Sequence, residues 1–424
     1  MSSYPSDFTL DDILENERVS TFFQPIVSLK TGTIFAFEAL VRGLKPDSDD
    51  LIAPKELFCQ ADRKTMALEF DRLCRKKALE HFSEFHANSS AMIFMNINTS
   101  VISAGSAEKP QIGTVSRQMG FDPRHIGLEL IESRAHSADD LVEFVRHYRD
   151  SGFLIVIDDF GSEHSNLDRL IQIHPDIIKI DRNLVTGIAD DPYRQSIVKS
   201  IHSLAQMTGS LCLAEGVETL EEIRVCHLIG IDLFQGFAIG EPSPDLPALE
   251  HQTLDRVAGL QNELHKSVVA ALRDKRRLTG DINVLADWLI RQLPSASGDN
   301  LDAVFMEFMA MNSEIECIYL LNARGTQISD TITSPFKQDN NRHSIFTPAL
   351  KGSNHAFKTY FTCFEALGIS RYLTDVYLSL ASGNLCRTFS IKLSKGDGNV
   401  GIDSILCMDF LEEAIKTTYA RQSS

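Results

Sequence analysis

The sequence lacks the long apolar segments that anchor or export a protein. No window of about 18 residues is apolar throughout, so we expect no membrane span. The first residues, MSSYPSDFTLDD, contain neither a basic segment nor an apolar one, so they do not form a secretory signal. These two absences predict a cytoplasmic protein.

Positive charge is scarce as well. The chain has 41 Lys and Arg residues against 58 Asp and Glu residues, which gives a formal net charge of −17. Phosphate groups are repelled by such a surface, so binding to nucleic acid or to an anionic membrane is not expected. A ligand that carries phosphate would need cationic side chains placed locally.

Cysteine pairing has no support in the sequence. Eight cysteines are scattered along 424 residues and no two form a Cys-x-x-Cys pair, which indicates free thiols in a reducing compartment. Hydrophobic residues make up 43% and charged residues 23%, as in ordinary globular proteins. The length suits two or three domains of roughly 150 residues each.

Short apolar segments alternate with amphipathic ones over the first 245 residues. Eight of them are candidate strands: 21–29, 35–43, 91–98, 126–132, 153–160, 176–181, 211–217 and 233–239. Strands that are apolar on both faces and separated by helices predict an α/β fold, a TIM-like (β/α)8 barrel. The link between the first two strands is too short for a parallel crossover, so we expect an antiparallel first strand.

One intervening helix has clear signals at both ends. Asp191 and Pro192 are typical of an N-cap and a first helical residue, and Gly209 is typical of a helix end.

Three prolines, Pro242, Pro244 and Pro247, mark a domain edge. We therefore expect the barrel in residues 1–248, a helical connector in 249–312 with one long amphipathic helix over 249–277, and an α+β domain in 313–424.

Hairpins over 322–325 and 381–384, followed by a strand at 401–410, give the last region a strand order that resembles PAS- or Cache-type sensor domains. A small-molecule or protein signal at this domain is one interpretation. Dimerisation or simple packing is the other.

Polar side chains follow the expected barrel strands at their carboxyl ends, where barrel enzymes place their chemistry. They are Glu38, Asn96, Glu129, Asp158, Asp159, Lys179, Asp181, Glu215 and Gln235. Six carboxylates that share one mouth with a single lysine must hold protons or cations. Oxygen ligands without His or Cys select Mg²⁺ or Mn²⁺ over zinc, and a pair of such ions suits phosphoryl chemistry.

The same residues carry a resemblance that extends over about residues 18–245. Its motifs, in order, are FQPIV at 23–27, EALVR at 38–42, MNIN at 95–98, ELIES at 129–133, DDFG at 158–161, KID at 179–181, EGVET at 215–219 and QGFAIGEPSP at 235–244. Together they resemble the EAL-domain family of cyclic di-GMP phosphodiesterases. The resemblance implies a barrel with a reversed first strand, and hydrolysis of cyclic di-GMP to linear pGpG by water activated by two Mg²⁺ or Mn²⁺ ions.

The resemblance also implies roles for individual residues. One metal would be held by Glu38, Asn96, Glu129 and Asp158, and the second by Asp159 with Asp158 as a bridge. Asp181 and Glu215 would complete the site directly or through water.

The remaining implied roles concern water, loops and ligand. Lys179 would hold the water or a phosphate oxygen, and Glu215 is a candidate general base, unless activation by the metals makes a base unnecessary. Glu218 would orient its neighbours and Glu132 would brace the loop that follows the metal site. The ligand would be bound by Gln24, Leu40, Arg42 and Gln235.

One loop departs from the family pattern. The family usually reads DDFGTGYSSL, whereas this chain reads DDFGSEHSNL, with Glu163 for a glycine and His164 for an aromatic residue. Because this loop couples metal binding to dimerisation in the family, a homodimer is expected but the strength and regulation of activity stay open. A receptor that binds cyclic di-GMP without cutting it is the second hypothesis, and a regulatory protein that does neither is the third.

Overall fold

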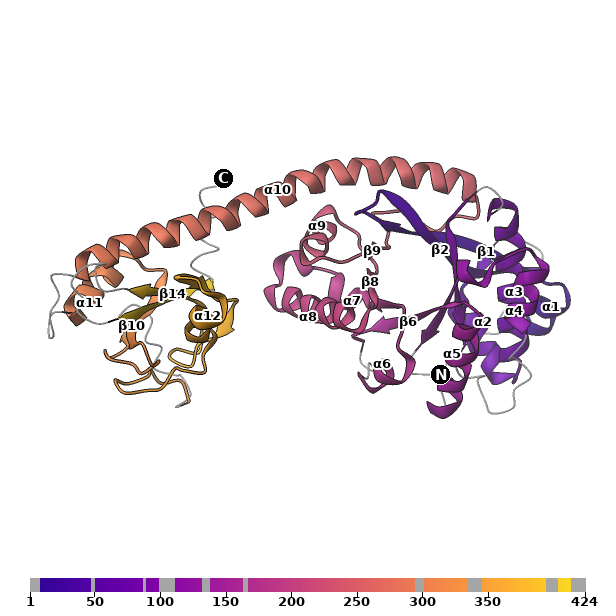
Figure 1. Cartoon of the computed structure of the whole chain (residues 1–424). Helices are drawn as coiled ribbons and strands as arrows, with labels where there is room; N and C mark the ends of the chain where they lie inside the picture. Colours follow the sequence, from indigo (N-terminus) through magenta and orange to yellow (C-terminus); the bar gives the residue numbers. More distant parts are fainter. Residues whose placement is uncertain are drawn as a thin grey trace. The chain divides into compact units, whose positions relative to one another are not determined.

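The computed structural model describes residues 8–46, 50–86, 89–98, 111–131, 138–162, 167–293, 301–334, 345–393 and 403–412. By its internal contacts the chain divides into two units, Met1–Val268 and Val269–Ser424. Each unit is described by itself below, and Figure 1 gives the element labels.

The first unit is built around a closed sheet of eight main strands. They are β1 (Val19–Ser28), β2 (Thr33–Leu44), β4 (Met92–Ile97), β5 (Ile126–Ile131), β6 (Leu154–Phe160), β7 (Ile177–Ile180), β8 (Leu211–Ala214) and β9 (Leu233–Phe234). The order is β1-β9-β8-β7-β6-β5-β4-β2, and pairing of β1 with β2 closes the barrel; the short β3 (Leu51–Ile52) extends β2. β1 runs antiparallel to both neighbours and the other barrel pairs are parallel, which confirms the expected fold class with its reversed first strand.

Helical segments connect these strands. Before β6 they are α1 (Leu10–Glu15), α2 (Pro54–Arg63), α3 (Ala67–His86), α4 (Gln111–Gln118), η2 (Pro123–His125) and α5 (Ala138–Asp150). After it come α6 (Leu167–Ile173), α7 (Arg182–Val185), η4 (Ile188–Asp190), α8 (Pro192–Thr208) and α9 (Leu220–Ile229). The signals for α8 are confirmed, because the Asp191 side chain accepts from the N–H groups of Tyr193 and Arg194, and Gly209 ends the helix with a left-handed backbone.

Every second side chain along the strands faces the barrel interior. Some of these side chains fill it and others form the polar layer at the strand ends. One buried cluster contains Ala36, Phe94, Val156, Ile177 and Leu213. Each of these residues stands two positions before a residue expected at a strand end, so both side chains face the same side of the sheet. In β5 the corresponding position is Gly127, where an added Cβ would lie 2.5 Å from the Phe94 ring. The apolar layer thus forms the floor below the polar layer.

The second unit contains a six-stranded antiparallel sheet. Its order is β11 (Ile332–Thr333), β10 (Ile315–Asn322), β15 (Ser404–Leu411), β14 (Leu385–Leu393) and β12 (Arg371–Leu373), with β13 (Tyr377–Leu378) also paired to β14. The β13–β14 hairpin and the late strand were both expected. A separate C-terminal sheet domain is therefore confirmed.

Helices cover the two faces of this sheet differently. Ile282, Ala286 and Leu289 from the end of α10 (Leu246–Gln292) share an apolar cluster with α11 (Leu301–Met311) and one sheet face. Tyr360 and Cys363 of α12 (Thr359–Leu367) share a cluster with the opposite face.

The long helix α10 exceeds its expected range at both ends. Leu249, Val257 and Leu264 belong to the barrel core, whereas its last turns belong to the second unit. Gly280 lies within the continuous helix, with no heavy atom near its Cβ position. Among the residues that the structure describes, no helix combines the length and hydrophobicity that a bilayer crossing requires.

Candidate active site at the carboxyl end of the barrel

Lys179 lies at the centre of the polar layer. Its side chain is 1% exposed, and its Nζ atom is 2.6 Å from Glu215 Oε1, 2.9 Å from Glu129 Oε1, 3.0 Å from Asp158 Oδ1 and 3.5 Å from Glu38 Oε2. Four strands thus direct carboxylates at one ammonium group. These carboxylates hold the pKa of Lys179 well above its usual value, although burial acts in the opposite direction.

Amide side chains hold Glu38 from the neighbouring strands. Asn96 Nδ2 donates to Glu38 Oε1 at 3.0 Å, and Gln235 Nε2 donates to Glu38 Oε2 at 2.5 Å. Gln235 Nε2 also lies 3.2 Å from Gln24 Oε1, so β1, β2, β4 and the end of β9 meet here. Burial alone would raise the pKa of Glu38, but Lys179 and the two amides together hold it below its usual value.

Two other carboxyl groups, those of Glu129 and Glu215, have pKa values that are raised rather than lowered. Burial, reinforced by Glu38, raises the pKa of Glu129 well above its usual value, although Lys179 opposes the rise. Burial likewise raises the pKa of Glu215 against the pull of Lys179. A site with one lysine and this many acids therefore retains protons unless further cations enter it.

Asp158 and Asp159 both reach the mouth although they are neighbours on a strand. Simple alternation would send them to opposite faces, but Asp159 has a left-handed backbone with φ of 54°, and the β6–β7 register shifts after Ile157. One oxygen each of Asp158, Asp159 and Glu215 lies within 4.8 Å of the others. Burial and the adjacent Asp158 raise the pKa of Asp159 to about 6.

The residues present fit divalent cations. Both carboxylate oxygens of Glu129 are buried; Oε1 pairs with Lys179 Nζ, whereas Oε2 accepts no hydrogen bond from the described residues. Unsatisfied buried carboxylate oxygens are costly, and a hard cation would satisfy them. The donor set around them consists of oxygen atoms, as Mg²⁺, Mn²⁺ and Ca²⁺ prefer.

A cavity of about 420 Å³ opens beside this cluster. It brings together most of the residues expected at the site: Gln24, Glu38, Leu40, Arg42, Asp159, Asp181, Glu215, Glu218 and Gln235. Arg42 lies with its guanidinium carbon 5.6 Å from the centre of the Phe22 ring. Arg42 therefore supplies positive charge at the cavity wall.

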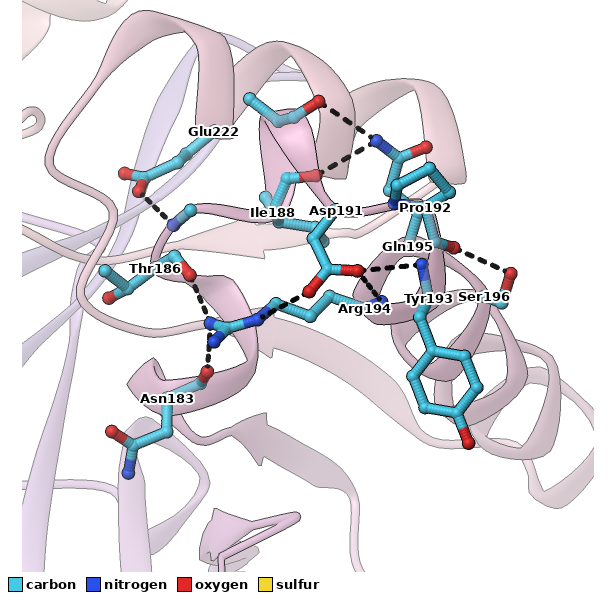
Figure 2. Close-up of polar contacts among 12 residues, drawn as sticks. Asn183, Thr186, Ile188, Asp191, Pro192, Tyr193, Arg194, Gln195, Ser196 and Glu222 are labelled. Carbon is cyan, nitrogen blue, oxygen red and sulfur yellow. Dashed lines mark hydrogen bonds and ion pairs between the residues drawn. The ribbon is translucent and has the colours of Figure 1, made fainter. Parts of the chain in front are cut away.

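Side chains of α8 and α9 hold the loops that form the cavity through hydrogen bonds to loop backbone groups. Arg194 donates to the carbonyls of Asn183 and Thr186 and to the Asp191 carboxylate, which ties down the segment after β7 (Figure 2). Glu222 accepts from the N–H of Gly187 at 2.9 Å, also drawn in Figure 2. Its other oxygen accepts from the N–H groups of Glu218 and Thr219 at 2.9 and 3.0 Å.

Sequence reasoning missed three residues at this site. Glu222 holds the EGVET loop. A Glu three residues after the N-cap Thr219 forms a capping box, and this sequence signal could have identified Glu222. Glu218 itself pairs with Arg182 at 2.9 Å. Arg182 and Phe237, which is 54% exposed, also line the cavity.

Close backbone packing explains a glycine in the last motif. A Cβ on Gly236 would lie 2.2 Å from the carbonyl oxygen of Val217, so the segments after β8 and β9 stack directly on each other. Three expected positions, Glu132, Glu163 and His164, lie outside the described residues.

The fold and the site together define a class: a (β/α)8-barrel protein with one reversed strand and an oxygen-rich site suited to divalent cations at the strand ends. A sequence profile of the EAL domain matches residues 9–242, more than half of the chain. This protein belongs to the EAL domain family.

Relatives with the same domain include proteins from two well-separated bacteria. The chain is 26% identical over 391 residues to the uncharacterized EAL-domain containing protein YkuI of Bacillus subtilis, which covers 89% of this chain and 93% of YkuI. It is 30% identical over 243 residues to the cyclic di-GMP phosphodiesterase PdeF of Escherichia coli. That match covers 57% of this chain but only 32% of PdeF, so the chain spans about a third of that relative.

Solved structures give a consistent picture of the fold. YkuI in complex with substrate c-di-GMP and calcium superposes with a TM-score of 0.77 at 22% identity, covering 95% of this chain and 99% of YkuI. The PaMucR phosphodiesterase in its c-di-GMP complex superposes with a TM-score of 0.52 at 26% identity, covering 56% of this chain and 97% of PaMucR. The likeness to YkuI therefore extends beyond the barrel to the C-terminal sheet domain.

Proposed function

We propose that this protein is a cyclic di-GMP-specific phosphodiesterase that hydrolyses cyclic di-GMP to linear pGpG. The observation that carries the proposal is the convergence of four carboxylates on Lys179 beside a cavity that three more carboxylates, Asp159, Asp181 and Glu218, line. Family membership supports the proposal, since relatives that share the barrel include the cyclic di-GMP phosphodiesterase PdeF and the PaMucR phosphodiesterase.

Two Mg²⁺ or Mn²⁺ ions are the proposed cofactors. Their proposed ligands are Glu38, Asn96, Glu129 and Asp158 for one ion and Asp158 with Asp159 for the other, completed by Asp181 and Glu215. When bound, such ions lower the pKa of water and stabilise the negative charge that develops on the phosphate. The buried Oε2 atom of Glu129, which lacks a donor among the described residues, supports this assignment.

Proton handling is proposed for Lys179 and Glu215. Lys179 is proposed to hold the attacking water or a phosphate oxygen, and its contacts with four carboxylates support a place at the centre of the site. Burial raises the pKa of Glu215 above its usual value, which makes it a stronger base than an ordinary carboxylate. Glu218 and Glu132 are proposed to orient neighbouring groups.

The dinucleotide is proposed to bind Gln24, Leu40, Arg42 and Gln235. Arg42 supplies the positive charge that an acidic protein needs for a phosphate ligand. The exposed Phe237 ring offers a surface on which a guanine can stack.

A second candidate function is a receptor that holds cyclic di-GMP without cutting it. The altered DDFGSEHSNL sequence favours it, because Glu163 replaces a glycine of the family pattern. Binding requires the cavity, whereas turnover also requires loops that position the metals.

The organisation around the barrel is also proposed. Residues 1–248 are the phosphodiesterase domain, 249–312 a helical connector, and 313–424 a PAS- or Cache-like sensor or dimerisation domain in a cytoplasmic homodimer. The antiparallel sheet of the last region supports an independent domain.

The decisive test is turnover of cyclic di-GMP with Mn²⁺, comparing the intact chain with Glu38→Gln. We expect pGpG from the intact protein and a loss of about 10²–10³-fold in the variant, because a metal ligand becomes a neutral amide. Glu80→Gln is the matched control, since Glu80 pairs with Lys77 at 3.3 Å on α3, outside the cavity.

The outcomes separate the candidates. Saturable binding by calorimetry with no pGpG at any metal concentration would establish the receptor. If the intact protein neither binds nor hydrolyses cyclic di-GMP, both functions are excluded.

A further inference from the structure

A second cavity, of about 610 Å³, lies in the C-terminal unit between one face of its sheet, the start of α12 and the β13 region. Its walls include Tyr319, Tyr360, Tyr377 and Asp409. The barrel chemistry uses none of these residues.

Asp409 is the most unusual of these side chains. It lies on β15, on the same face of the sheet as Ile405 and Cys407, which is the face that α12 covers. It is 2% exposed. Its Oδ1 accepts from Thr388 Oγ1 at 2.7 Å, and its Oδ2 accepts from Cys317 Sγ at 3.1 Å and Tyr377 OH at 3.3 Å. Within the described ranges, no lysine, arginine or histidine forms an ion pair with it.

The neighbouring histidine does not supply the missing charge. Gln327 uses its Nε2 to donate to Ser329 O and Thr331 Oγ1, so its Oε1 accepts from His355 Nε2 at 2.9 Å. His355 Nδ1 then accepts from Tyr360 OH at 2.6 Å. These contacts suit the neutral ring with its proton on Nε2, and burial lowers the pKa of His355.

A second buried acid adds to the negative charge of this unit. Glu316 is 3% exposed and its carboxylate accepts from Asn384 and Cys386. The lysine that lines the cavity, Lys358, is exposed at the start of α12. The buried part of the described lining therefore offers acceptors and negative charge, and the cation of the lining, Lys358, is exposed.

The cavity is apolar on another part of its wall. Leu378 and Leu380 line it and are 50% and 58% exposed, so they are available for contact with a hydrocarbon group. Four tyrosine rings, those of Tyr319, Tyr360, Tyr372 and Tyr377, also line it, and aromatic faces attract organic cations. A negative floor with aromatic and aliphatic walls matches an amphiphilic cation.

We propose that this cavity binds a small organic amine, with its ammonium group paired to Asp409 and its apolar substituent against Leu378 and Leu380. This site lies in a different unit from the proposed phosphodiesterase site and does not depend on it. The competing explanation is that Asp409 only links β10, β13, β14 and β15 through hydrogen bonds, a role that needs an acceptor but no charge.

Matched probes separate these explanations in the intact chain. Calorimetry would compare hexylamine and 2-phenylethylamine with 1-hexanol and 2-phenylethanol, which have the same substituents but no charge. We expect at least one amine to bind saturably and at least about tenfold more tightly than its alcohol. If neither amine binds more tightly than its alcohol, the proposal is wrong.

Variants then locate the contact. Asp409→Asn retains an acceptor but loses the charge, so it should lose the preference for amine over alcohol, while Asp403→Asn, exposed just before β15, should keep it. An Asp409→Asn protein with the intact preference would overturn the proposal. If Asp409→Asn does not fold, a crystal structure of the intact protein with the better amine decides, because a nitrogen placed away from Asp409 would refute the pairing.

Discussion

The two units of this protein bury carboxylates in opposite ways. In the barrel, Lys179 lies within 3.5 Å of four carboxylates, so part of their charge is compensated by the chain itself. In the C-terminal unit, Asp409 and Glu316 are buried but are held by neutral hydrogen-bond donors. Since an unpaired buried charge is costly, the comparison shows two ways to reduce that cost: an internal lysine in the barrel, and neutral hydrogen-bond donors in the C-terminal unit.

Removing the Lys179 ammonium group would leave the barrel carboxylates without a cation, as in the described part of the C-terminal unit. This change should have the largest effect on the free energy of unfolding. Lys179→Met leaves four buried carboxylates without their ammonium partner, so the free energy of unfolding should fall by about 3–5 kcal/mol in metal-free buffer. Chemical denaturation measures this change. Mn²⁺ should recover part of the lost stability, because it replaces the missing positive charge.

A matched control keeps that experiment specific. Lys30→Met removes a surface lysine that pairs with Asp232 at 2.6 Å, and it should cost less than about 1 kcal/mol. If Lys179→Met were as stable as the intact protein without metal, the carboxylates would be neutralised by protons rather than by the lysine.

Acid should stabilise the C-terminal unit through Asp409. Burial raises the pKa of this carboxyl to about 6 from 3.8, so the folded state takes up a proton before the unfolded state does. Lowering the pH from 7 to 4 should therefore increase the free energy of unfolding by up to about 3 kcal/mol from this group, and raising the pH through 6 should remove that gain.

The contribution of Asp409 is the difference between the pH dependence of stability of the intact chain and that of Asp409→Asn. Identical pH profiles of the two proteins, measured by denaturant unfolding between pH 4 and 7, would show that Asp409 titrates normally.

A smaller effect is expected from the carboxylates that support the barrel loops. Glu222→Gln weakens three hydrogen bonds to backbone N–H groups and should reduce the free energy of unfolding by about 1–3 kcal/mol. Glu218→Gln alters an exposed ion pair and should change it by less than about 0.5 kcal/mol. Thermal unfolding of both variants checks the order, and a larger loss in Glu218→Gln would contradict it.

The smallest effect on the proposed reaction should come from separating the units. A chain ended after Val268 keeps Leu249, Val257 and Leu264, which pack in the barrel core, and loses the second unit. We expect the rate of cyclic di-GMP turnover to change by a few fold and not to vanish, because no residue proposed for that chemistry is removed. Steady-state kinetics of the two proteins test this, and unchanged kinetics would argue against regulation by the second unit.

Much of the barrel could be predicted because its signals are local. Apolar runs located the eight strands, a short link required the reversed first strand, and Asp191 with Gly209 defined α8. Their position at the carboxyl ends of the expected strands then placed Glu38, Glu129 and Lys179 at one mouth. These inferences need only the order of residues along one segment.

Other features could not be predicted because they depend on pairs of distant segments. The contact of Lys179 with four carboxylates, the left-handed backbone that turns Asp159 into the mouth, and the support from Glu222 each arise between separate elements. Asp409 gave no signal at all, since a lone acid in an apolar strand does not reveal what surrounds it.

The order of residues along the chain was enough to predict the fold class, the direction of the first strand, the family resemblance and the set of polar residues at the strand ends. Which of these side chains share one ammonium group, and how neutral donors hold the buried acids of the C-terminal sheet, depended on the folded structure. The reason is physical: secondary structure and facing follow from periodicity along the chain, whereas charge compensation depends on distances across it.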